Sequence, residues 1–251
     1  MSGHSKWSSI KHQKGVTDSR RGQLFTKLTR EIIVAVREGG NNPEANFRLR
    51  LAIQKARDNN MPQDNIERAV KRGAGETEGA SLVELVLEGY GPSGAAILVK
   101  ALTDNRNRTL QDVRNIFSRS GGNLGESGCV AWLFDTKGLI RVVANDLDTE
   151  TLALEAIDAG AEDVNVEDNQ MEIYTKPEEL EAVRKALEER KITIASAELA
   201  IVPKTTVELE EKAAEQTLKL LDKLEELDEV QHVASNANFP DSVLEKYQLA
   251  V

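Results

Sequence analysis

The feature that most constrains the fold is an ordered series of strand-like and helix-like segments between residues 139 and 201. Short runs rich in β-branched residues indicate strands, and apolar residues spaced three or four apart indicate helices. The segments are strand 139–144, helix 148–159, strand 163–166, strand 172–175, helix 177–190 and strand 194–201. This βαββαβ order predicts a ferredoxin-like domain, in which two helices cover one face of a four-stranded antiparallel sheet.

The first third of the chain predicts a small helical domain. In residues 22–37 apolar side chains recur every four positions, as on one face of an amphipathic helix. A Gly-Gly-Asn-Asn-Pro break follows it, and further helices are expected at 43–58 and 63–72. Residues 73–81 are rich in Gly and lack apolar periodicity, so we expect a linker there.

Strand-like runs and a further helix surround the ferredoxin-like segment. Before it, we expect strands at 82–90 and 95–102 around a Gly-Pro turn, a helix at 109–120 and a short strand at 129–134. After it come a Leu-rich helix at 209–226 and a strand at 230–234, which have no core of their own. We therefore expect this helix and strand to return to the earlier sheet.

The expected fold class is α+β with three domains. They are a basic helical nucleic-acid-binding domain at 1–75, a discontinuous α+β domain at 82–134 plus 205–240, and an inserted ferredoxin-like domain at 135–204. A chain of 251 residues is long enough for such a division.

Charge is distributed very unevenly along the chain. Residues 1–75 hold 15 basic and 7 acidic side chains, a balance of +8, whereas residues 76–251 hold 17 and 35, a balance of −18. A local excess of Lys and Arg suits a phosphate backbone, even where the whole chain carries −10. The alternative is a solvated basic tail, against which Trp7 and Ile10 argue.

The polar segment 103–109, Thr-Asp-Asn-Arg-Asn-Arg-Thr, lies between a predicted strand and a predicted helix. It could form a loop tip whose two guanidiniums and two amides suit phosphate oxygens and base edges. Alternatively, Asp104 or Asn105 bonds the following turn and Thr109 caps the helix. The two interpretations are compatible, because a capped helix can hold a functional loop rigid.

No group of residues indicates catalysis, a metal site or a cofactor. Cys129 is the sole cysteine and the three histidines lack metal-ligand spacing, so we expect no enzyme activity and no metal. The glycines of 121–125 indicate backbone turns more simply than a phosphate-binding loop. With no apolar run near about 18 residues and no secretory signal, we expect a cytoplasmic protein without a membrane or small-molecule ligand.

Several long motifs resemble one family over nearly the whole chain. They are GHSKW, RRGQLFTKLTREI, NPEANFRLRLAIQKARDNNMP, EGYGPSGAA, LTDNRNRT and VRNIFSRSGGNLGESGCVAWLF. In this order they are similar to the YebC/PmpR family, which includes the mitochondrial translational activator of cytochrome oxidase. The chain departs from the family at Cys129, where Ser is more usual, and the two residues are nearly isosteric.

The resemblance implies an N-terminal helical domain followed by two α/β domains, and nucleic acid as the partner. It implies that a set of N-terminal basic residues meets the nucleic-acid backbone, namely Lys6, Lys11, Lys14, Arg20, Arg21, Lys27 and Arg30. Arg106 and Arg108 would lie in the loop that carries the family signature.

Three functions are compatible with these features. The first is a DNA-binding transcriptional regulator, although the third helix has its basic residues mostly near its C-terminal end, unlike a base-reading helix. The second is a ribosome-associated translation factor that binds rRNA and relieves stalling at proline-rich stretches, as the resemblance implies for some members. The third is a protein-binding adaptor that uses the acidic surface and the helix at 209–226.

Overall fold

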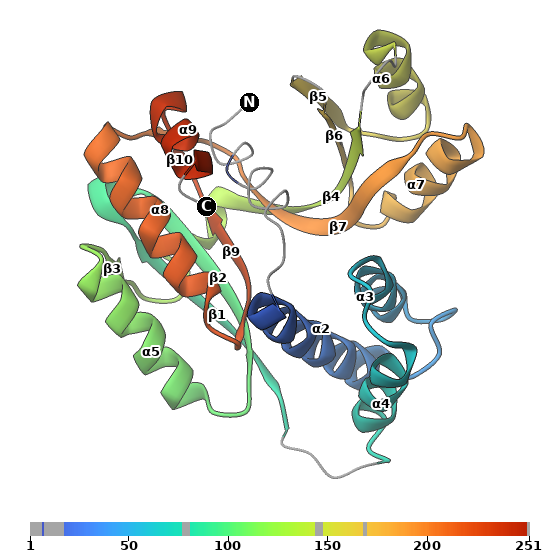
Figure 1. The fold of residues 1–251 in the computed structure, drawn as a ribbon, viewed down its shortest axis with the longest axis horizontal. Helices are drawn as coiled ribbons and strands as arrows, with labels where there is room; N and C mark the ends of the chain where they lie inside the picture. The colour runs from blue at the N-terminus through green and yellow to red at the C-terminus, as the bar shows by residue number, and fades with distance from the viewer. Residues whose placement is uncertain (1–6, 8–17, 77–80, 144–147, 168–169, 250–251) are drawn as a thin grey trace. The chain divides into compact units, whose positions relative to one another are not determined.

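The structure, a computed structural model, describes residues 7, 18–76, 81–143, 148–167 and 170–249 (Figure 1). Its elements confirm the expected α+β class, with an N-terminal helical domain followed by two α/β domains. The chain folds into two compact units, one formed by Phe134–Lys204 and the other by the segments before and after it.

The Phe134–Lys204 unit has the expected ferredoxin-like topology. Its elements are β4 (Phe134–Val143), α6 (Thr149–Asp158), β5 (Asp163–Glu167), β6 (Gln170–Thr175), α7 (Leu180–Glu189) and β7 (Ile194–Pro203). The strand order is β5-β6-β4-β7, and every neighbouring pair is antiparallel. The central strands bury Ile140, Met171 and Ile173 completely, and α6 and α7 supply Ala156 and Leu187 to the buried set.

Two elements of this region differ from the prediction. The strand expected at 129–134 is absent, since Ala131–Leu133 form a 3₁₀ turn, η2, and β4 begins at Phe134. The backbone N–H groups of Val130 and Ala131 donate to the carboxylate of Glu88, so they are not available to a neighbouring strand. The helix expected from residue 177 begins three residues later, after a turn.

The helical domain contains α2 (Asp18–Gly39), α3 (Phe47–Asp58) and α4 (Gln63–Gly73). They pack around a core that includes Ile32, Leu49 and Ile66, each no more than 2% exposed. The first helix is thus longer than the expected 22–37, and the third agrees closely with its predicted range.

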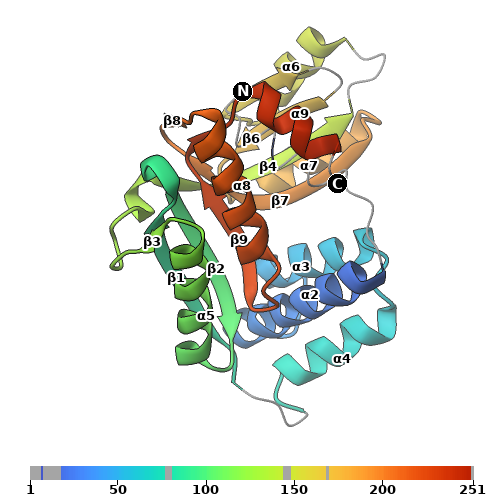
Figure 2. The same ribbon diagram turned by 60° about the vertical axis from the view of Figure 1, so that its left-hand side comes forward.

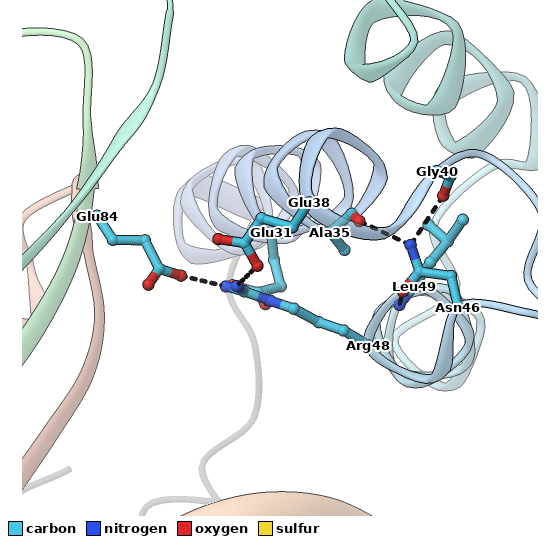
Figure 3. Close-up of polar contacts among 8 residues, drawn as sticks. All are labelled: Glu31, Ala35, Glu38, Gly40, Asn46, Arg48, Leu49 and Glu84. Carbon is cyan, nitrogen blue, oxygen red and sulfur yellow. Dashed lines mark hydrogen bonds and ion pairs between the residues drawn. The ribbon is translucent and has the colours of Figure 1, made fainter.

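The second helix starts later than predicted because Asn46 caps it. The Asn46 side-chain oxygen accepts from the Leu49 N–H at 3.0 Å, so the helix begins at Phe47, four residues after the expected start at residue 43. Its amide nitrogen donates to the carbonyls of Ala35 at 2.7 Å and Gly40 at 2.8 Å (Figure 3). One buried side chain therefore both starts α3 and fixes the end of α2.

The discontinuous sheet contains β1 (Val83–Tyr90), β2 (Ala96–Thr103), β3 (Asn123–Leu124) and β9 (Val230–Ser235) in the order β3-β1-β2-β9. Strand β9 pairs with β2, as expected for a segment that returns to the earlier sheet. Helices α5 (Arg106–Arg119) and α8 (Glu211–Glu225) lie over it (Figure 2) and share its core through Phe117 and Leu221.

Several short elements of this part are not among those expected from the sequence. They are the 3₁₀ turn η1 (Pro92–Gly94), strands β3, β8 (Val207–Glu208) and β10 (Ala237–Asn238), and helix α9 (Asp241–Leu249). Trp7 is 2% exposed and belongs to the same core, which agrees with the expectation that the N-terminal segment is more than a charged tail.

Candidate nucleic-acid interface

The expected contacts at the start of the chain are only partly described. Lys6, Lys11 and Lys14 lie outside the described residues, and Arg20 lies in the first turn of α2. Arg21 follows it with an exposed side chain.

The next two cationic residues of α2, Lys27 and Arg30, form contacts within the protein. Gln23, Lys27 and Arg30 are spaced four and three residues apart, so they share one helix face. Gln23 Nε2 donates to the Glu226 carbonyl at 3.4 Å, and Lys27 Nζ donates to the Glu225 carbonyl at 2.5 Å. This face therefore docks on the turn that follows α8.

Arg30 and Arg108 meet at one carboxylate in this turn. Arg30 Nη2 lies 3.6 Å from Glu229 Oε1, and Arg108 Nη2 lies 3.1 Å from the same oxygen. Arg108 also pairs with Asp104 at 3.0 Å. The structure thus brings together two residues that are 78 positions apart in the chain, and it balances much of their charge internally.

The segment 103–109 is the start of a helix rather than a loop tip. Asn105 is the N-cap of α5, and its Oδ1 accepts from the Arg108 N–H at 3.1 Å. Thr103 Oγ1 accepts from the Asn105 N–H at 2.9 Å and from Thr109 Oγ1 at 2.8 Å. The expected loop tip and the expected Thr109 cap are therefore wrong, whereas the expected hydrogen bond between Asn105 and the following turn is confirmed.

Arg48 is a further basic residue of the helical domain that is engaged internally. Its guanidinium pairs with Glu31 at 2.9 Å and also with Glu38 and Glu84 (Figure 3). Burial opposes the charge, but the carboxylates of Glu31 and Glu84 outweigh it and raise the pKa of Arg48 above its ordinary value. Because Glu84 belongs to β1, Arg48 joins the helical domain to the sheet.

A second internal anchor holds the glycine-rich loop beside β1. Glu88 is 4% exposed, and its carboxylate accepts from the N–H groups of Gly128 at 2.7 Å, Val130 at 2.8 Å and Ala131 at 2.7 Å. Burial alone would raise the pKa of Glu88, but these three donors outweigh it and lower that pKa below 4.5. The Glu88 carboxylate therefore holds the loop. The three backbone N–H groups that could otherwise bind an anion already donate to this carboxylate.

The glycines after α5 serve backbone packing. Gly121 has a φ of 79°, which favours glycine, and a Cβ on Gly122 would lie 2.5 Å from the Tyr90 carbonyl oxygen. This agrees with the expected backbone role of the 121–125 segment.

The described residues contain no cluster of three or more His, Cys, Asp or Glu side chains arranged to bind a metal ion. Within the same described ranges, no helix combines the length and apolarity needed to cross a membrane.

Known proteins resemble this chain from end to end. A family model described as the TACO1/YebC protein N-terminal domain matches residues 5–76, and one described as the TACO1/YebC second and third domain matches residues 82–237. A "Probable transcriptional regulatory protein" of Dehalococcoides mccartyi is 62% identical over 98% of each chain.

Proteins of somewhat lower identity also match nearly the whole chain. A "Probable transcriptional regulatory protein" of Persephonella marina is 54% identical and covers 98% of this chain and 99% of its own length. The crystal structure of a conserved hypothetical protein from Aquifex aeolicus is 51% identical, with a TM-score of 0.86 over 94% of this chain and 97% of that one. The described fold is therefore one that an experimental structure also has.

Proposed function

We propose, because this chain belongs to the TACO1/YebC family, that it is a regulator of gene expression that acts by binding nucleic acid, without a catalytic step. The names of the relatives support the regulatory part. The observation that carries the binding part is the charge balance of +8 in residues 1–75 against −18 in the remainder. Such a distribution presents one end of the molecule to a polyanion and repels the other.

Duplex DNA is the leading ligand of this proposal, and the transcriptional names of the relatives favour it. The helical domain supplies exposed cations beyond those docked on the α8–β9 turn. Arg21, Lys71 and Arg72 are exposed in α2 and α4. Contacts of this type bind phosphate with little dependence on base sequence.

Ribosomal RNA is the second candidate, and one feature of α4 favours it. Helices α3 and α4 are joined by a short turn, as in a helix-turn-helix, but the exposed N-terminal part of α4 carries Asp64 and Glu67. A recognition helix reads bases with this part, and two carboxylates there oppose approach to DNA. Binding to the rRNA backbone needs no base-reading helix, which fits a role in relieving stalling at proline-rich stretches.

Binding across a salt series tests the proposal. In the test variant, the five basic residues that precede the docked face of α2 are changed to Ala, namely Lys6, Lys11, Lys14, Arg20 and Arg21. If these residues contact phosphates, the slope of log affinity against log salt falls by about 4 to 5. The control has the same charge change in the Phe134–Lys204 unit, at Lys176, Lys185, Arg190, Lys191 and Lys204. Equal binding by the wild type and the test variant would contradict the proposal.

Co-sedimentation with ribosomes in the presence of duplex DNA separates the two ligands. Ribosome binding that resists excess DNA supports the translational role, and loss of ribosome binding to modest DNA supports the transcriptional one.

A further inference from the structure

Helix α5 concentrates the arginines of its domain. Residues 82–133 and 205–251 contain four arginines, and all of them lie in α5. The helix carries a single acid, Asp112, although the second of these segments is strongly acidic. A local positive charge on one helix therefore stands against an acidic background.

The helix turns one face to the core and the opposite face to solvent. Thr109, Val113 and Phe117 are no more than 2% exposed. The exposed side chains of α5 are guanidiniums, amides, one hydroxyl and one carboxylate, from Arg106, Asn107, Arg108, Gln111, Asp112, Arg114, Asn115, Ser118 and Arg119. No aromatic residue lies on the exposed face of α5.

Three of the four arginines are not neutralised. Arg108 pairs with Asp104 and Glu229. Within the part of the chain that the structure describes, Arg106, Arg114 and Arg119 have no ion-pair or hydrogen-bond partner for their guanidiniums, and all three are exposed. The chain has 42 acidic and 32 basic residues, so these three guanidiniums remain unpaired among the described residues although acidic side chains are in excess.

The start of α5 lies beside α2. Glu229 contacts Arg30 of α2 and Arg108 of α5, so the two helices approach each other at the shared carboxylate. A nucleic acid held by the N-terminal half of α2 can therefore extend along α5 without leaving this unit.

We propose that the exposed face of α5 is a second nucleic-acid contact surface that enters the major groove of duplex DNA. Arg114 and Arg119 on this face, with Arg106 at the start of the helix, bind backbone phosphates, and the amides of Asn107 and Gln111 face base edges. This proposal rests on the proposed function and assigns a further element to it.

The shape and chemistry of α5 favour duplex DNA over RNA. The major groove of B-DNA is about 12 Å wide and admits a helix, and Arg, Asn and Gln are the side chains that read its base edges. The deep, narrow major groove of A-form RNA does not admit side chains in this way. Recognition of single strands relies on aromatic stacking, and the exposed face of α5 has no aromatic residue.

Fluorescence anisotropy with a labelled 20-base-pair DNA of random sequence tests this assignment in the full-length protein. The test variant is Arg106→Ala, Arg114→Ala, Arg119→Ala. The matched control is Lys212→Ala, Lys219→Ala, Lys223→Ala, which removes three exposed cations from the neighbouring helix α8. We expect the α5 variant to bind at least about tenfold more weakly at 100 mM salt with a salt slope reduced by about 2 to 3, and the α8 variant to keep most of its affinity.

Ser118→Glu provides an independent variant, because it adds an acid to the same face and removes no contact. We expect it also to weaken DNA binding, while circular dichroism shows an unchanged fold. An equal loss in the α5 and α8 variants, or a loss for an RNA duplex but not for DNA, would overturn the assignment. If the wild type binds DNA and the α5 variants bind equally well, only the role of α5 is refuted. If the wild type binds no nucleic acid, the proposed function itself is refuted.

Discussion

Substitution of Glu88 by Gln tests whether one buried carboxylate holds the loop between α5 and β4. The carboxylate accepts three backbone N–H groups, of which Val130 and Ala131 share Oε2 and Gly128 uses Oε1. In Glu88→Gln the amide oxygen can keep the shared position, but the amide nitrogen then faces the Gly128 N–H. One bond is lost, the partly buried Gly128 N–H loses its acceptor, and the two remaining bonds lose their charge.

The expected cost follows from these changes. Hydrogen bonds to charged groups contribute about 1.5–3 kcal/mol each, and the penalty for the unpaired Gly128 N–H is small because this residue is exposed and water can reach it. Since two bonds survive in neutral form, we expect the free energy of unfolding to fall by about 2–4 kcal/mol. Glu84→Gln is the matched control on the same strand, because its carboxylate is 49% exposed and pairs with Arg48. Loss of that exposed pair costs about 1 kcal/mol or less.

Tryptophan fluorescence during urea unfolding measures this difference selectively. Both tryptophans, Trp7 and Trp132, lie outside the Phe134–Lys204 unit, so their emission reports the unit that contains Glu88. Trp132 is 66% exposed and donates from Nε1 to the Cys129 carbonyl, which places a reporter in the loop itself.

Acid adds a second readout. The folded pKa of Glu88 is lowered, so its stabilisation is complete above the unfolded value near 4.5 and is lost as the pH falls through the lower folded value. The wild type should therefore lose its advantage over Glu88→Gln in acid. A variant within about 0.5 kcal/mol of the wild type at pH 7 would refute the anchoring role of Glu88.

Three further substitutions or treatments have defined outcomes. Asn46→Ala should lower stability by about 2–3 kcal/mol in thermal unfolding followed by circular dichroism, because it removes the α3 cap and the amide that donates to the Ala35 and Gly40 carbonyls; Asn46→Asp keeps the cap but sets a carboxylate oxygen against the same two carbonyls, so it should cost at least as much. Arg141→Ala removes the guanidinium 3.1 Å from the buried carboxylate of Glu172 and leaves that charge with the Tyr174 hydroxyl, so we expect a loss of about 3–5 kcal/mol in urea unfolding of the Phe134–Lys204 unit; a loss below about 1 kcal/mol would contradict this. Burial and the charge of Glu88 raise the pKa of the Cys129 thiol. Its alkylation by iodoacetamide at pH 8 should therefore be slower than that of glutathione and should accelerate at higher pH. A rate equal to that of glutathione would be inconsistent with this environment.

The sequence predicts those parts of the fold in which local pattern and tertiary packing agree. The βαββαβ unit is an example, since the buried positions Ile140, Met171 and Ile173 lie in runs whose composition already indicates strands. The range 129–134 has similar composition, but the N–H groups of Val130 and Ala131 donate to Glu88, which lies 42 and 43 positions earlier in the chain. No local pattern shows this.

The candidate site is less predictable for the same reason. Asn105 and Thr109 are both good capping residues, and only the hydrogen bond to the Arg108 N–H decides between them. Because Val113 and Phe117 are apolar and spaced four residues apart, the sequence indicates that Arg114 and Arg119 are exposed. It does not show which arginines of α5 form ion pairs. The pairing of Arg30 and Arg108 with Glu229 depends on the approach of three segments that are distant in the sequence.

The pairing of Phe134 with Pro203 at the open end of β4 and β7 has a consequence for how this chain can be altered. Paired residues of antiparallel strands lie about 5 Å apart, so the polypeptide enters and leaves the ferredoxin-like unit at nearly the same point. Two or three glycines suffice to span that gap. Evolution or a designer can therefore lengthen, exchange or remove residues 134–204 as a cassette, while the ends of the flanking sequence remain close enough to be joined.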